Sequence, residues 1–176
     1  MSSNTATPHI EALIHTVFKE GLCGDFYIVD IEIKGNNQIV VFVDGDDGLS
    51  LGNCKQISRT IEAVLDEEPT LGGIYALEIS SPGVTRPLKF LRQYIKHVGR
   101  LLQIKRLDGT AIEGVLKECV ANGVMVEVPS KEKKGLPELI EIPFDEIKET
   151  YVKVQFGKIK KEKKEKKEKK VKKKKK

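Results

Sequence analysis

Two stretches in the first half of the chain have apolar side chains at helical spacing. Thr7-Pro8 predicts a helix start, because a hydroxyl can cap the first turn and proline is tolerated at the first helical position. The apolar residues that follow lie at i, i+3, i+4, i+7 and i+8: Ile10, Leu13, Ile14, Val17 and Phe18. Ser50 precedes a second such set: Cys54, Ile57, Ile61, Val64 and Leu65. The pattern therefore predicts two amphipathic helices.

Three segments around these helices alternate between apolar and polar residues in the manner of strands. Residues 27–33 and 39–43 flank a Gly35-Asn36-Asn37 turn and predict a β-hairpin. The alternation returns over residues 75–79. The resulting order α-β-β-α-β predicts an α+β domain of two layers, because three strands can bury an apolar face only if both helices cover it.

The pattern changes after residue 80. Two prolines and a glycine interrupt Ser81–Leu88, so this segment cannot continue the strand and is expected to form an ordered turn or hinge. Five strand-like segments follow, at residues 101–107, 111–119, 124–128, 139–142 and 150–155, with a single helical turn over 143–147 before the last. Five short strands separated by turn residues are typical of a small β-barrel of the SH3-like or Sm-like kind.

These patterns divide the chain into four predicted segments. They are an α+β domain over residues 1–84, a linker over 85–89, a β-barrel domain over 90–157 and a tail over 158–176. The tail holds 14 lysines and 3 glutamates and has nothing to bury, which predicts disorder. The expected linker and hinge residues are Ser81, Pro82, Gly83, Arg86 and Pro87.

The formal net charge of +5 conceals three regions of different charge. Residues 1–84 carry 4 basic and 13 acidic side chains, whereas residues 85–157 carry 13 basic and 10 acidic ones. The sequence pI of about 9.0 therefore describes the tail. An acidic first domain repels phosphate and favours a basic protein as its partner, while the basic residues around the linker and the tail favour RNA.

The residues that could carry catalysis or bind metal do not form a recognisable site. His9, His15 and His97 have no carboxylate or cysteine at ligand or triad spacing. The acidic run 44–48 faintly resembles a calcium loop, but Lys55 stands where an EF-hand needs its last glutamate. We interpret the run as a solvated loop or an acidic contact surface, with weak divalent binding as a further alternative. No enzyme activity, cofactor or metal is therefore expected.

The chain also lacks the signals of a membrane or secreted protein. No apolar run approaches the ~18 residues needed to span a bilayer. The first residues have neither the basic nor the apolar region of a signal peptide. A cytoplasmic protein without a membrane partner is expected.

The segment Leu77–Leu88, which reads LEISSPGVTRPL, resembles the signature of the bacterial ribosome maturation factor RimP family. The resemblance extends to both sides, through Val43-Asp44, Cys54, Ser58-Arg59, Leu65-Asp66, Tyr75, Phe90, Gly99, Gly114, Leu116, Pro143 and Ile147. It departs at Thr85, where the family usually has an aspartate before the linker arginine. A turn or salt bridge that depends on that aspartate is therefore not expected.

The resemblance implies an α+β domain joined to an Sm-like barrel and a non-enzymatic role in assembling the small ribosomal subunit. It also implies a location in the cytoplasm and binding to free small subunits and to small-subunit ribosomal protein twelve. We expect a monomer. The residues expected to contact the basic protein are Asp44, Asp46, Asp47 and Glu78, and those expected to contact rRNA are Arg86, Lys89 and Arg92. The alternative function is a generic RNA-binding module that uses the barrel and the lysine-rich tail.

Overall fold

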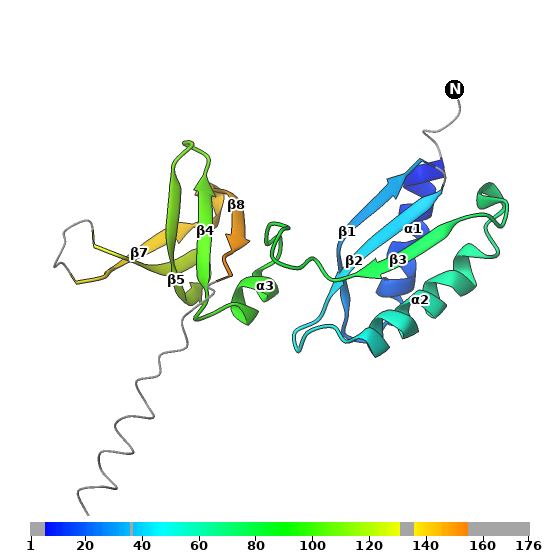
Figure 1. Cartoon of the computed structure of the whole chain (residues 1–176), viewed down its shortest axis with the longest axis horizontal. Coiled ribbons are helices and arrows are strands. Elements are labelled where there is room, and N and C mark those ends of the chain that lie inside the picture. The colour runs from blue at the N-terminus through cyan, green and yellow to red at the C-terminus, as the bar shows by residue number, and fades with distance from the viewer. Residues whose placement is uncertain (1–5, 36, 131–135, 155–176) are drawn as a thin grey trace, which may run out of the picture.

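A computed structural model describes residues 6–35, 37–130 and 136–154. Two sheets, one of three strands and one of five, each carry their own hydrophobic core. The linker and a short helix lie between them (Figure 1). The α+β class predicted from the sequence is confirmed. The predicted tail lies outside the described residues.

The first sheet has the predicted order of elements. These are α1 (Ala6–Lys19), β1 (Tyr27–Lys34), β2 (Gln38–Asp44), α2 (Leu51–Leu65), the 3-10 turn η1 (Pro69–Leu71) and β3 (Ala76–Ser80). β2 lies in the centre, antiparallel to β1 and parallel to β3. The parallel pair is possible because α2 carries the chain back across the sheet between β2 and β3. The predicted hairpin and both predicted helices are confirmed.

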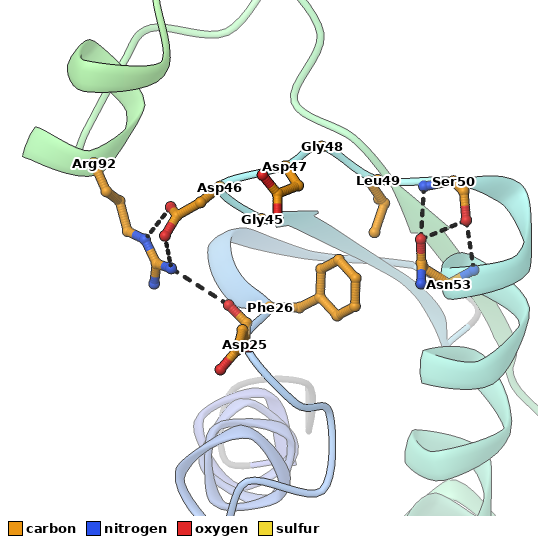
Figure 2. A pocket seen from close by; sticks show the side chains of 10 residues that line it. All are labelled: Asp25, Phe26, Gly45, Asp46, Asp47, Gly48, Leu49, Ser50, Asn53 and Arg92. Carbon is orange, nitrogen blue, oxygen red and sulfur yellow. Dashed lines mark hydrogen bonds and ion pairs between the residues drawn. The ribbon is translucent and has the colours of Figure 1, made fainter.

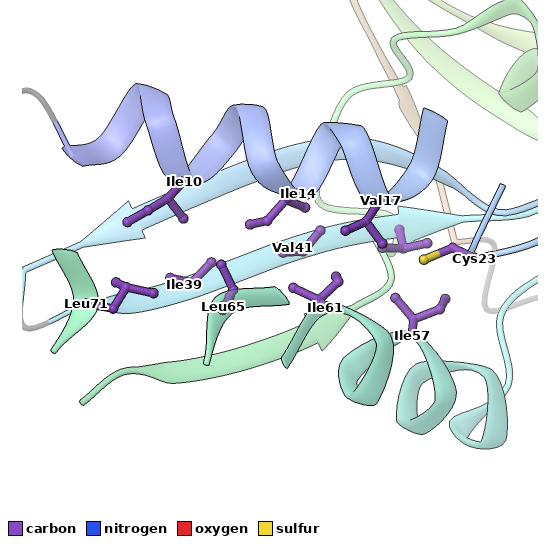
Figure 3. Packing of buried hydrophobic residues seen from close by; sticks show 11 residues of the cluster. Ile10, Ile14, Val17, Cys23, Ile39, Val41, Ile57, Ile61, Leu65 and Leu71 are labelled. Atoms are coloured by element: carbon purple, nitrogen blue, oxygen red, sulfur yellow. The ribbon is translucent and has the colours of Figure 1, made fainter. Parts of the chain in front are cut away.

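Both helices cover the same face of this sheet (Figures 1 and 3). Alternate residues of β2 point to that face and pack against the apolar stripes of the two helices. The buried cluster consists of Ile10, Ile14, Val17, Cys23, Ile39, Val41, Val43, Ile57, Ile61, Leu65 and Leu71. The opposite face of the sheet is left for polar residues and for the linker.

The start of α2 is fixed by the predicted serine cap. The backbone N–H of Asn53 donates to Ser50 Oγ at 3.1 Å, and the N–H of Ser50 donates to Asn53 Oδ1 at 3.0 Å. This reciprocal capping satisfies two backbone donors and sets the direction in which the chain leaves β2. The acidic turn between β2 and α2, residues 44–48, is thereby held at one end of the sheet.

The second sheet is antiparallel throughout. Its elements are β4 (Leu101–Arg106), β5 (Ala111–Val120), β6 (Gly123–Val128), β7 (Glu138–Pro143), the 3-10 turn η2 (Phe144–Glu146) and β8 (Ile147–Val152). The strand order is β7-β6-β5-β4-β8. Within the described residues β7 and β8 are the two edges, and no ladder joins them. The sheet is therefore not a closed barrel.

The prediction for the last strand was wrong by about three residues. It was expected at residues 150–155, whereas β8 begins at Ile147, directly after η2. Ile147 pairs with Arg106 across an irregularity in β4. The buried position between Glu149 and Tyr151 is Thr150, whose polar side chain disguises the alternation of the strand. Gln155 lies outside the described residues.

The linker is followed by a helix that the sequence pattern did not predict. α3 spans Leu91–Lys96 and packs against the second sheet, where Tyr94 and the preceding Leu88 belong to the core. Gly83 has a φ of +58°, so the chain turns there through a conformation that favours glycine. The N–H of Leu88 donates to the carbonyl of Thr150 at 2.8 Å, which fastens the end of the linker to β8. Among the residues that the structure describes, no helix is long and apolar enough to cross a membrane.

Candidate functional site

The candidate site is a group of opposite charges where the linker and α3 meet the first sheet. We call it the charged junction. Its basic members come from the linker and α3, and its acidic members come from β1 and from the end of β2: Arg86, Lys89, Arg92 and Lys96, with Asp30, Glu32, Asp44 and Asp46.

Gln93 positions the basic side chains of α3. Its side chain is almost fully buried, with 1% exposed, and Oε1 accepts the backbone N–H of Lys89 at 2.8 Å and of Phe90 at 3.1 Å. Gln93 is the third residue of α3, so its side chain takes the part of the glutamate or glutamine in a capping box, which reaches back to the N–H groups just before the helix. Arg92 and Lys96 are four residues apart, so they share one face of the helix. That face is directed at the acidic turn 44–48.

Arg92 makes the most complete contact at this face (Figure 2). Its Nε and Nη2 donate to the two carboxylate oxygens of Asp46 at 2.9 and 3.0 Å, and Nη2 also lies 3.4 Å from the carbonyl of Asp25. The guanidinium lies 3.9 Å from the ring centroid of Tyr27. Tyr27 in turn meets Phe90 edge to face, at 5.9 Å between centroids. The contact therefore combines a bidentate ion pair with cation–π stacking.

Lys96 binds the adjacent carboxylate. Its Nζ donates to Asp44 Oδ1 at 2.5 Å and to the carbonyl of Gly45 at 2.9 Å. Asp44 is buried, with 5% of its surface exposed, and its Oδ1 also accepts the N–H of Gly45 at 2.9 Å. A buried carboxylate requires such partners, because desolvation of an unpaired charge is costly.

Arg86 forms the second half of the junction, on the sheet face that the helices leave open. Its Nη1 donates to Asp30 Oδ2 at 2.7 Å, and its Nη2 donates to Glu32 Oε1. The guanidinium lies 3.4 Å from the ring centroid of Phe42. Lys89 Nζ reaches the other oxygen of Asp30 at 3.0 Å. The linker is thus fixed to β1 by two basic residues.

Strand register explains why these groups come together. Residues directly opposite one another in neighbouring strands share a face, and Asp30 lies opposite Phe42. Glu32 lies opposite Val40, which lies opposite Glu78 on β3. The open face of the first sheet therefore carries Asp30, Glu32 and Glu78 together with Phe42.

A cavity of 710 Å³ opens beside Arg92 (Figure 2). It is lined by Asp25, Phe26, Gly45, Asp46, Asp47, Gly48, Leu49, Ser50, Asn53 and Arg92. Three of these residues are aspartates, so the cavity suits a cationic group. Among the residues that the structure describes, no cluster of histidine, cysteine, aspartate and glutamate could hold a metal ion.

We expect acid to weaken the junction. The hydrogen bonds from Arg92 and Arg86 hold the pKa values of Asp46 and Glu32 below their ordinary values of 3.8 and 4.5. Groups with a depressed pKa stabilise the folded arrangement above the unfolded pKa, and this contribution is lost as pH falls through the folded pKa. The junction should therefore be constant above about pH 5 and loosen below about pH 4.

Small-angle X-ray scattering from pH 7 to pH 3 measures this loosening, with circular dichroism to show that the sheets remain folded. Asp46→Asn should already be looser at pH 7 and should respond less to acid. A folded chain whose dimensions do not change over this range would contradict the expectation.

The structure places the predicted protein-contact and RNA-contact residues together rather than on separate parts of the chain. Asp44 and Asp46 pair with Lys96 and Arg92, while Asp47 lies beside them in the wall of the cavity. Among the predicted RNA contacts, Arg86 and Lys89 also bind carboxylates of the first sheet. Glu78 is exposed on β3.

The other residues predicted to form the hinge lie in the segment between the two sheets. Pro82 is buried, whereas Ser81 and Gly83 are exposed and Pro87 is half-buried. Arg86 takes its carboxylates from β1, so the aspartate that Thr85 replaces is not needed for pairing.

Sequence reasoning missed the residues that complete the site from β1 and β2. The alternation along the strands marks Asp30 and Glu32 only as polar positions, and Tyr27 and Phe42 only as apolar ones. A usable signal was present, because two carboxylates at i, i+2 must share one face of the sheet. Four basic residues between 86 and 96 offered matching partners.

Comparison with known proteins gives a consistent result. A model of the RimP N-terminal domain matches residues 20–85. The ribosome maturation factor RimP of Flavobacterium psychrophilum is 40% identical over 112 residues, which cover 64% of this chain and 70% of that protein. The RimP of Christiangramia forsetii is 31% identical over 154 residues, which cover 84% and 97% of the two chains.

A third relative is the RimP of Cytophaga hutchinsonii, which is 35% identical over 116 residues, covering 63% of this chain and 70% of that protein. The matched family domain includes β1, β2 and the acidic turn, and it ends at Thr85, directly before Arg86. On these similarities, the chain belongs to the ribosome maturation factor RimP family.

Proposed function

We propose that the protein is a ribosome maturation factor that binds the free small ribosomal subunit and assists its assembly without catalysis. The similarity to a protein named ribosome maturation factor along 97% of that protein's length carries this proposal. Its action consists of binding and release in the cytoplasm, where it holds a basic ribosomal protein or an rRNA conformation until the subunit matures.

The charged junction supports a basic protein as one partner. The carboxylates of Asp44 and Asp46 already bind an ammonium and a guanidinium group, which are the groups that a lysine- and arginine-rich protein presents. We propose that small-subunit ribosomal protein twelve is this partner and that Asp47 and Glu78 extend the contact. Contact of Arg86, Lys89 and Arg92 with rRNA belongs to the same proposal, and it requires these side chains to leave their carboxylates.

The second sheet supports an Sm-like domain as the other half of the factor. β4, its first strand, lies between β5 and β8, so the last strand returns beside the first. This order leaves β7 and β8 as the two edges, which are the strands that would meet if the sheet curled toward a barrel. We propose residues 1–84 and 90–157 as the two domains, with residues 85–89 as their linker. The lysine-rich tail would add salt-dependent attraction to RNA without sequence specificity.

Gradient sedimentation tests the proposed function. Full-length protein and a chain that ends at Gly157 are mixed with free small subunits at physiological salt, and free large subunits serve as the control. Both chains should sediment with small subunits and not with large ones, the shorter chain more weakly. Loss of all binding with the lysines, or equal binding to both subunits, would contradict the proposal and favour a generic RNA-binding module.

A further inference from the structure

Two places on the first sheet are built to hold a guanidinium group. In one, Asp46 binds Arg92 at 2.9 and 3.0 Å and Tyr27 lies 3.9 Å from the same group. In the other, Asp30 and Glu32 bind Arg86, whose guanidinium lies 3.4 Å from the Phe42 ring. Each place therefore supplies a carboxylate and an aromatic face.

This combination is selective for arginine. A guanidinium is planar and weakly hydrated, so it can form a forked hydrogen bond with a carboxylate while its flat face stacks on a ring. All the groups that hold it come from β1, β2 and the acidic turn. Both places would remain in the first sheet if the chain's own arginines left.

The ion pairs at one of these places are open to exchange. The side chains of Arg92 and Asp46 are 39% and 64% exposed, and an exposed pair contributes little to stability. The cavity of 710 Å³ beside Arg92 also offers Asp25 and Asp47 to a second cationic group. A basic side chain from outside can therefore approach Asp46 without disrupting a core.

We infer that these two places receive arginine side chains of a basic protein partner, and that Arg86 and Arg92 are internal competitors which occupy them in the free protein. The inference rests on the proposed function, since it takes the basic partner from there. Partner binding and attachment of the linker and α3 to the first sheet then exclude each other. The apparent affinity for the partner is reduced by the fraction of molecules in which the places are occupied.

The geometry favours a protein over RNA as the competing partner. Detachment of the linker and α3, which carry Lys89 and Lys96 as well as the two arginines, leaves a surface with the carboxylates of Asp25, Asp30, Glu32, Asp44, Asp46 and Asp47. Such a surface repels phosphate. RNA would have to bind the released arginines instead, and it would then respond to substitution with the opposite sign.

Two substitutions that break the same ion pair provide the test. A fluorescent hexa-arginine peptide is titrated into full-length wild type, Arg92→Ala and Asp46→Asn at physiological salt, and circular dichroism verifies folding. Arg92→Ala removes the competitor and should raise the affinity about twofold to fivefold, whereas Asp46→Asn removes the receiving carboxylate and should lower it by a similar factor. If this ion pair had only a structural role, both substitutions would change the affinity for the peptide in the same direction.

Matched variants control for net charge. Arg59→Ala removes a positive charge from the exposed side of α2, and Asp145→Asn removes a negative charge from η2, so neither should show more than the small effect of net charge. Equal or same-sign effects of the two junction variants would overturn the inference. So would unchanged affinity of both junction variants for the peptide together with a response to a fluorescent oligouridylate alone, in which Asp46→Asn binds more tightly and Arg92→Ala more weakly. In either case the proposed function would remain supported if the protein still sedimented with free small subunits.

Discussion

Replacing Arg86 by glutamate is expected to detach the linker from the first sheet. The substitution places a third carboxylate against Asp30 and Glu32, so two ion pairs become repulsive contacts. It also removes the stacking on Phe42, which is worth about 1 kcal/mol for a partly exposed pair. Because Lys89 shares Asp30 with Arg86, its attachment should weaken as well.

Small-angle X-ray scattering measures this detachment as a larger radius of gyration and a broader distribution of distances. Arg59→Glu is the matched control, since it makes the same change in net charge on the exposed side of α2. Arg86→Lys should give an intermediate result, because lysine keeps the charge but loses the fork and the stacking. Equal dimensions for Arg86→Glu and Arg59→Glu would show that the junction does not hold the two sheets together.

Replacing Gln93 by leucine is expected to lower the free energy of unfolding by about 1–3 kcal/mol. Leucine has a similar volume but cannot accept the N–H groups of Lys89 and Phe90, so both donors lose their partner. The start of α3 then frays, and Arg92 and Lys96 are less well directed at the acidic turn. Urea denaturation measures the loss of stability.

Gln93→Glu separates the cap from the packing. Its carboxylate still accepts both N–H groups, which offset part of the cost of burying its charge, and the expected loss of stability is smaller than that of the leucine variant. If leucine were as well tolerated as glutamate, the side chain would act by filling space, and the capping role assigned to Gln93 would be wrong.

The first sheet could be predicted from the sequence because its local signals agree with its packing. Ser50 caps α2, and the apolar stripe of α2 contains three fully buried residues, Ile57, Ile61 and Leu65. α3 escaped prediction because it has only six residues and its N-cap position holds Phe90, which makes no side-chain cap hydrogen bond. The start of β8 was misplaced because the helical turn predicted over residues 143–147 includes its first residue, and because the buried Thr150 interrupts the apolar alternation of the strand.

The site could be predicted only in part, because the net charge of a segment does not say which charged side chains pair with one another. Counting showed that the first 84 residues are acidic and that the linker is basic, and it suggested separate partners for the two. The ion pairs depend on strand register and on the distance between side chains in space, and the number of charges in each segment contains neither. Asp30 and Arg86 are far apart in the sequence and yet form an ion pair of 2.7 Å.

The most direct test of the proposed account is a calorimetric titration of small-subunit ribosomal protein twelve into the full-length chain at physiological salt. The account predicts saturable binding that weakens about fivefold or more in Asp46→Asn/Asp47→Asn. The double variant Glu141→Gln/Asp145→Asn, which removes two exposed carboxylates from the second sheet and η2, should bind nearly as wild type does. Absence of saturable binding, or equal affinities for the two double variants, would contradict the account.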